Sequence, residues 1–240
     1  MNRTVQFGEG LFETILWKGE NKKLRLHYSR LKSSAEFFSI PCPTYEEFLE
    51  SIRTAVGGAT DMYVKYILLS EGPDHYGAQP EGYRVEIKVR EAPRPPETVD
   101  LCFSSYRRHS ANPLFRHKTT SYLFNVLVKR EAVRRGYFDG VVLNERGEVT
   151  ECSASNLILL IHDRLYTPAR ESGLLWGTTL ELLSQSFDIR EEYLKPGDLL
   201  RADSIFLTNS LIGVVQVLSL EGKKKEINGE ALRELKKAFL

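Results

Sequence analysis

Two residues of the chain, a lysine and a glutamate, have surroundings that suit chemistry on an aldehyde and a flat ring. Lys118 lies in "RHKTTSYLFNVL", just before a predicted helix, and Glu151 opens the run of small residues in "GEVTECSASNLILL". The ordinary place for either side chain is in water at the surface. In a dry pocket, however, a lysine loses its proton more readily and can attack an aldehyde as a free amine. A carboxylate among small residues can approach a flat ring and keep a ring nitrogen protonated.

Three further motifs are candidates for anion binding. "GLLWGTTLELL" puts Thr178 and Thr179 at the start of an amphipathic helix, where free backbone amides bind anions or a threonine simply caps the helix. "FLTNSLIGVV" ends an apolar strand with Asn209 and Ser210, which are either turn formers or phosphate ligands. The ordinary interpretation of Arg30, in "HYSRL", is an exposed arginine on a helix.

A basic run, Arg107, Arg108 and His109, precedes Lys118. Its cations can pair with the carboxylates of an acidic substrate, whereas an exposed basic loop is the commoner outcome. A nucleic-acid binder could use the same run. The chain has 33 Lys and Arg against 32 Asp and Glu, a net charge of +1, which is too balanced for affinity that depends on a phosphate backbone. We therefore expect no nucleic acid.

Hydrophobic periodicity predicts the elements of the first lobe. Helices are expected over 27–38 and 44–56, the second with a capping box of Thr44 and Glu47. Strands are expected over 62–70 and 83–91, because the second alternates apolar and charged residues. Three prolines in "REAPRPPETVD" cannot continue a sheet and mark a boundary.

Beyond the prolines the pattern indicates a β-rich lobe with peripheral helices. The expected strands cover 100–106, 140–144, 156–161, 164–166, 204–208 and 213–220. The expected helices cover 120–135, a short segment from about 178, and the C-terminal "GEALRELKKAFL". The fold class is therefore α+β. We predict a small α+β domain at 1–92, a linker with the first strand of the second lobe at 93–112, and a larger β-rich domain at 113–240.

The composition limits which classes of protein remain possible. With 42% hydrophobic and 27% charged residues, the 240-residue chain is typical of a globular protein without repeats. Its three cysteines have no metal-like spacing, which predicts buried thiols and neither a disulfide framework nor a metal site. No stretch has membrane-spanning length, so we expect a cytoplasmic protein.

Six segments of the chain, considered together, closely resemble the fold-type IV enzymes that depend on pyridoxal 5′-phosphate. They are "QFGEGLFETI", "HYSRL", "HKTTSYLFNVL", "GEVTECSASNLIL", "YTPARESGLLWGTT" and "FLTNSLIGVVQV". These enzymes include branched-chain aminotransferases, D-amino acid aminotransferases and aminodeoxychorismate lyases. The resemblance covers nearly the whole chain. It implies a two-lobed α+β fold like that of D-amino acid aminotransferase, with the cofactor bound by the larger domain, and a homodimer.

The resemblance also implies roles for individual residues. Lys118 corresponds to the Schiff-base lysine and proton shuttle, and Glu151 to the partner of the pyridine nitrogen. Tyr122 corresponds to a residue packed beside the cofactor. The implied phosphate ligands are Arg30, Thr178, Thr179 and Ser210. Arg107, Arg108 and Asn209 are candidates for binding a dicarboxylate substrate.

Local features favour one subgroup. Tyr122 follows Lys118 by four residues, whereas branched-chain enzymes usually have the tyrosine one place later. The loop "SEGPDHYG" has His75 but lacks the arginine of D-amino acid aminotransferases, and Phe12 replaces their usual tyrosine. "TNSLIGVVQV" and "SYRRHSANPLFRHK" resemble the lyases, which implies cleavage of 4-amino-4-deoxychorismate to 4-aminobenzoate and pyruvate, a step of folate biosynthesis. The alternative is an aminotransferase acting on D-amino or branched-chain amino acids.

The chain departs from these relatives at its start. Only six residues precede Phe7, so the usual first strand is largely absent. We expect the edge of the small domain, or its dimer contact, to be built differently.

Overall fold

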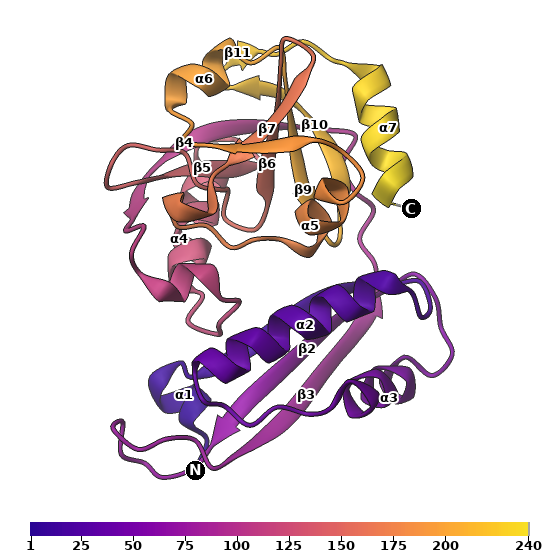
Figure 1. The fold of residues 1–240 in the computed structure, drawn as a ribbon, viewed down its shortest axis with the longest axis vertical. Helices are drawn as coiled ribbons and strands as arrows, with labels where there is room; N and C mark the ends of the chain where they lie inside the picture. Colours follow the sequence, from indigo (N-terminus) through magenta and orange to yellow (C-terminus); the bar gives the residue numbers. More distant parts are fainter. Residues whose placement is uncertain (240) are drawn as a thin grey trace. The chain divides into compact units, whose positions relative to one another are not determined.

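The computed structural model describes residues 1–239, which form two compact units (Figure 1). Unit 1 contains Met1–Pro93 and His117–Tyr122, and unit 2 contains Arg94–Arg116 and the chain from Leu123 onward. The first division lies within the proline-rich segment. The predicted boundaries did not separate residues 117–122 from the larger lobe, although in the structure this segment belongs to unit 1.

Unit 1 is a three-stranded antiparallel sheet of order β1-β2-β3 with two long helices. Its elements are α1 (Arg3–Phe7), β1 (Gly10–Trp17), α2 (Lys22–Phe37), α3 (Tyr45–Val56), β2 (Met62–Glu71) and β3 (Gly82–Glu91). Successive side chains of a strand point to opposite faces. The face that carries Leu11, Ile15, Val64 and Tyr66 packs with buried residues of α2 and α3 into one hydrophobic core.

Of the two long helices, α3 starts and stops within one residue of its predicted bounds. α3 has the expected capping box, because Thr44 and Glu47 each bond the other's backbone amide. It ends at Gly57, whose φ of 57° is the left-handed conformation that glycine adopts most easily. α2 begins earlier than predicted, because the Asn21 side chain caps its first turn by accepting from Lys23 N.

The short N-terminus forms a one-turn helix, α1, that the sequence did not reveal. Its Arg3 is 1% exposed and donates to the carbonyls of Pro73, His75 and Ala78, which lie in the loop between β2 and β3. Burying a guanidinium is tolerated only when it is paired and hydrogen-bonded. Glu9 supplies the opposite charge. The N-terminal residues therefore hold this loop in place.

Unit 2 contains an eight-stranded mixed sheet of order β5-β4-β10-β9-β6-β7-β8, with β11 paired to β10. Its strands are β4 (Thr98–Arg108), β5 (Asp139–Asn144), β6 (Asn156–Ile161), β7 (Arg164–Pro168), β8 (Ile189–Glu192), β9 (Ser204–Asn209), β10 (Gly213–Leu220) and β11 (Lys223–Lys224). Its helices are α4 (Leu123–Arg134), α5 (Thr178–Ser184), α6 (Pro196–Arg201) and α7 (Gly229–Phe239), with 3-10 turns at Pro113–Arg116 and Arg170–Ser172.

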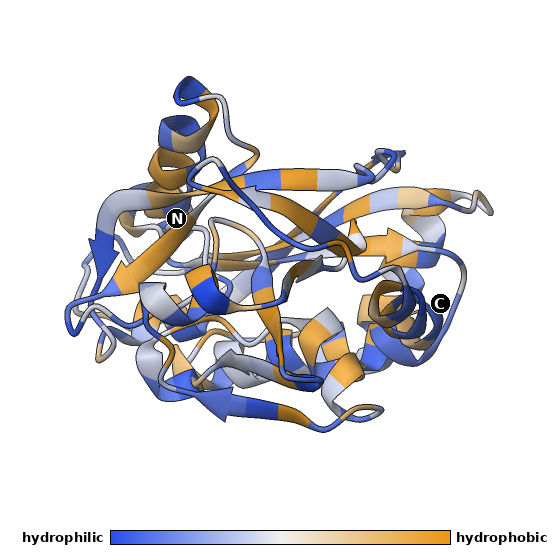
Figure 2. Cartoon of the chain, turned by 90° about the horizontal axis from the view of Figure 1, so that it is seen from above, coloured by the Kyte–Doolittle hydropathy of each residue, from blue (hydrophilic) through white to orange (hydrophobic). Residues whose placement is uncertain are grey.

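The central strands of unit 2 are buried on both faces. Alternate residues of β6 enter two different cores: Leu157 and Leu159 join one, while Ile158 and Leu160 join the other, which includes Leu180 of α5. This explains why β6 is a continuous apolar run. In Figure 2, hydrophobic and hydrophilic residues are interspersed along the helices and strands.

The predicted strands and helices of unit 2 are present, with ends shifted by a few residues, and β8, α6 and β11 are additions. No helix within residues 1–239 is long and apolar enough to cross a membrane.

Candidate functional site

The Lys118 segment is attached to the first strand of unit 1. Phe12 N donates to Lys118 O at 2.9 Å, and Thr120 N donates to Gly10 O at 2.8 Å. Thr120 Oγ1 also donates to Gly8 O at 3.0 Å. These bonds fix the backbone at Lys118 and just after it.

Aromatic rings line the Lys118 side chain. Its Nζ lies 4.5 Å from the ring centre of Phe12 and 5.6 Å from that of Tyr122. The two rings meet edge to face, with centres 5.1 Å apart. Aromatic faces attract an ammonium and displace water from it. Lys118 and Tyr122, both predicted site residues, therefore lie together.

Lys65 of β2 is a second cation on the same ring, and sequence reasoning missed it. Its Nζ lies 4.5 Å from the centre of Phe12. Burial, and then the charge of Lys88 opposite on β3, lower the pKa of Lys65. A lysine inside the apolar stretch "MYVKYILLS" was the available signal.

Arg30 of α2 is not an exposed helix arginine, because its side chain is 14% exposed. Its Nε and Nη2 donate to the two carboxylate oxygens of Glu13, at 2.8 and 2.6 Å. His27 Nδ1 lies 2.6 Å from Glu13 Oε2. Although burial alone would raise the pKa of Glu13, Arg30 and His27 lower it to about 2. Glu13 was not predicted as a site residue.

In unit 2, Glu151 is buried and held by three donors. Arg108 Nη1 donates to Oε1 at 2.6 Å, and Leu175 N donates to the same oxygen at 3.2 Å. Asn156 Nδ2 donates to Oε2 at 3.2 Å. The ordinary interpretation of Glu151, a carboxylate in a turn exposed to water, is therefore wrong.

Arg108 and Arg107 have opposite environments. Arg107 is exposed, whereas the side chain of Arg108 is 0% exposed and its guanidinium carbon lies 4.6 Å from the centre of the Phe115 ring. Within residues 1–239, Nε and Nη2 of Arg108 have no hydrogen-bond partner. The bonds of Arg108 that the structure shows run from Nη1 to Glu151 and to Gly173 O, and we propose that Arg108 positions this carboxylate rather than contacting a substrate.

The start of α5 is connected to Glu151 through Asn156, another residue that sequence reasoning missed. Gly177 N donates to Asn156 Oδ1 at 3.0 Å. A Cβ at Gly177 would lie 2.2 Å from that oxygen, so only glycine fits without a shift. Thr178 and Thr179 follow and are buried. The first amides of a helix have no intrahelical acceptor, which suits them to an anion.

Asn209 forms a turn, which was one of the two roles that the sequence left open for it. Its Nδ2 donates to Ala154 O at 3.1 Å and to Ser155 Oγ at 2.9 Å. Its Oδ1 accepts from the amides of Leu211 and Ile212, both at 2.9 Å. These bonds connect the turn that carries Ser210 to the small residues after Glu151. We therefore propose a structural role for Asn209 instead of the expected substrate contact.

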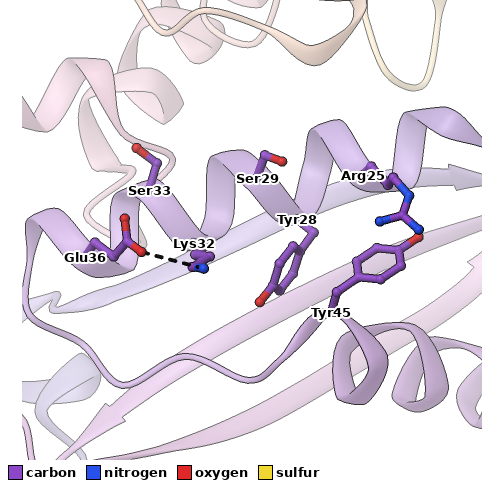
Figure 3. Close-up of a pocket in the computed structure, with 7 residues that line it drawn as sticks. All are labelled: Arg25, Tyr28, Ser29, Lys32, Ser33, Glu36 and Tyr45. Atoms are coloured by element: carbon purple, nitrogen blue, oxygen red, sulfur yellow. Dashed lines mark ion pairs between the residues drawn. The ribbon is translucent and has the colours of Figure 1, made fainter.

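A separate pocket lies on the outer side of α2 (Figure 3). Its lining includes Arg25, Tyr28 and Tyr45, and Tyr28 donates from its hydroxyl to Pro43 O at 2.9 Å. The Arg25 guanidinium lies 4.4 Å from the ring centre of Tyr45. None of the predicted site residues lines this pocket.

Known proteins similar to this chain include both aminotransferases and aminodeoxychorismate lyases. The family model "Amino-transferase class IV" matches residues 10–220. A branched-chain-amino-acid aminotransferase from Salmonella typhimurium is 24% identical over 92% of this chain and 79% of its own length. An aminodeoxychorismate lyase from Vibrio harveyi is 26% identical over 95% of this chain and 89% of its own length. Among solved structures, a "Putative 4-amino-4-deoxychorismate lyase" from Legionella pneumophila superimposes with a TM-score of 0.91 at 28% identity, covering 98% of this chain and 91% of that one.

Proposed function

Because the chain belongs to the class IV aminotransferase family, whose enzymes use pyridoxal 5′-phosphate, we propose that it is a lyase that converts 4-amino-4-deoxychorismate to 4-aminobenzoate and pyruvate. Similarity to the Vibrio and Legionella proteins supports this choice. The relatives that bear the aminotransferase name keep the alternative open.

The donor groups of this chain suit the cofactor. The aldehyde of the cofactor reacts with an amine, and its ring nitrogen pairs with an anion. Its phosphate is bound by a set of N–H and O–H donors. Lys118 is an amine between aromatic rings, and Glu151 is a buried carboxylate. Thr208 Oγ1 is buried without a hydrogen-bond partner among residues 1–239, on the strand that leads to Ser210.

The residues predicted to hold the cofactor keep their proposed roles. When bound, pyridoxal phosphate supplies an electron sink that acidifies the proton on the carbon bearing the substrate's amine. Lys118 would remove that proton, the substrate ring would become aromatic as its C–O bond to the enolpyruvate group breaks, and Lys118 would give the proton to the departing enolpyruvate, which becomes pyruvate. Glu151, paired with the adjacent Arg108, would hold the ring nitrogen protonated. Arg30, Thr178, Thr179 and Ser210 would bind the phosphate, and Tyr122 would pack beside the ring.

The position of Lys65 is the observation that favours an acidic substrate. Its ammonium lies against the same Phe12 ring as the reactive amine. A site for an aliphatic side chain gains from apolar surface, and a cation there costs desolvation without compensation. A carboxylate of 4-amino-4-deoxychorismate would instead pair with Lys65. We propose Lys65, in place of Arg108, as a ligand of the substrate.

Replacing Lys65 with methionine is therefore expected to raise KM for 4-amino-4-deoxychorismate by about 10–100-fold, the equivalent of one hydrogen bond to a charged group. Steady-state kinetics measure this, and cofactor content should stay at the wild-type level. Lys88→Met is the matched control, because Lys88 is exposed on the neighbouring strand opposite Lys65. Equal KM values for the two variants would remove Lys65 from the site.

The function itself is tested with the purified holoenzyme. It is incubated with 4-amino-4-deoxychorismate and, separately, with D-alanine or L-leucine plus a 2-oxo acid. We expect 4-aminobenzoate fluorescence in the first reaction and little keto acid in the others. Rapid transamination of either amino acid, with no 4-aminobenzoate formed, would identify an aminotransferase instead.

A further inference from the structure

Glu13 is a charged residue within an apolar surface. Its neighbours on the same face of β1 are Leu11 and Ile15, both part of the hydrophobic core, and Glu13 itself is 0% exposed. An ionised carboxylate placed there without partners would lose its hydration and gain nothing in return. Its presence therefore requires an explanation in terms of the groups that it holds.

The partners of Glu13 come from one turn of α2. His27 and Arg30 are three residues apart, which puts both side chains on the same helix face. Arg30 bonds both carboxylate oxygens through Nε and Nη2, and His27 Nδ1 bonds Oε2. A two-point contact between planar groups fixes the plane and the direction of the guanidinium, which a single bond does not.

The state of His27 adds to this arrangement. Burial lowers the pKa of His27, against the opposing effect of Glu13, while Arg30 and Lys118 lower it further. A neutral His27 donates from Nδ1 to the carboxylate, which fixes its tautomer. Glu13 and Arg30 then cancel each other's charge, so the cluster is neutral inside the core.

We propose that Glu13, supported by His27, positions Arg30 to bind the phosphate of the cofactor. This inference rests on the proposed function, because the phosphate contact of Arg30 belongs to it. Glu13 holds the Nε–Nη2 edge of the guanidinium and so fixes its orientation. Glu13 makes no contact with the cofactor and acts only through Arg30.

A purely structural ion pair would have a different signature. Loss of such a pair would weaken binding of every form of the cofactor, or of none. A positioning role affects only ligands that carry the phosphate. Pyridoxal, which has the aldehyde and the ring but no phosphate, separates the two cases.

The test uses the full-length protein freed of cofactor, and titrates pyridoxal phosphate and pyridoxal into wild type and Glu13→Gln by absorbance. We expect Glu13→Gln to raise the Kd of pyridoxal phosphate by about tenfold or more, the value of a charged hydrogen bond, and to leave the Kd of pyridoxal unchanged. In an Arg30→Met background, Glu13→Gln should have no further effect on pyridoxal phosphate.

Other results would overturn the inference. An unchanged Kd for pyridoxal phosphate in Glu13→Gln, or an equal loss for both ligands, would show that Glu13 does not act through the phosphate. If Glu13→Gln does not fold, Glu13→Asp keeps the charge but shortens its reach, and the same pattern is expected of it. Failure of the wild type to bind pyridoxal phosphate would overturn the proposed function as well, and is recognised in the first titration.

Discussion

Lys118→Ala is expected to lower turnover by at least about 10³-fold, because the variant loses the amine that joins the cofactor and also a positioned acid–base group, which alone contributes roughly 10²–10⁴-fold. The fold should persist. The bond to Phe12 N uses the backbone carbonyl of residue 118, which alanine retains.

Borohydride reduction followed by peptide mapping measures the chemical part of this prediction. Wild-type protein should carry a pyridoxyl group on Lys118, and the alanine variant should carry none. Lys88→Ala, which removes an exposed lysine of β3, serves as the control and should keep both the adduct and the activity. An adduct on another lysine in wild-type protein would contradict the assignment of Lys118.

Arg108→Ala is expected to cause the largest loss of stability, about 3–5 kcal/mol, because it leaves Glu151 as a buried charge without its ionic partner. For a chain of this size, the loss corresponds to a fall in Tm of roughly 10 °C. Arg107→Ala removes the neighbouring exposed arginine and should change Tm little.

Calorimetry of the two cofactor-free variants under identical conditions measures the difference. Both lose one arginine from adjacent positions, so changes in net charge cancel in the comparison. Similar Tm values would mean that the pair between Arg108 and Glu151 contributes nothing beyond a surface contact. The proposed positioning of Glu151 would then lose its support.

The contrast between Arg107 and Arg108 shows where sequence reasoning stopped. Leu101 and Cys102 of β4 are both buried, so alternation from the first places Arg107 inward and alternation from the second places Arg108 inward. In the structure Arg108 follows the parity of the buried Cys102 and Ser104, whereas Ser105 and Arg107 are exposed. Where a strand is buried on both faces, hydrophobic periodicity favours neither side, so the pattern held no reason for two adjacent arginines to differ.

Elements that depend on local signals were predictable. The capping box of α3 and the alternation in β3 depend on residues close together in the chain, and both are present in the structure. α1 depends instead on Arg3 reaching carbonyls some 70 residues away, which no local pattern contains. The candidate site behaves likewise. The motifs identified Lys118, Glu151 and Arg30, whereas Lys65, Glu13 and Asn156 are recognised through contacts with segments farther along the chain.

The assignment of residues 117–122 to unit 1 affects how this protein can be divided. The chain passes between the units after Pro93, after Arg116 and after Tyr122. A fragment that stops at Pro93 would therefore leave the amide of Phe12 and the carbonyl of Gly10 without their backbone acceptor and donor. Domain exchange with a relative would have to transplant the lysine-bearing segment together with the N-terminal piece.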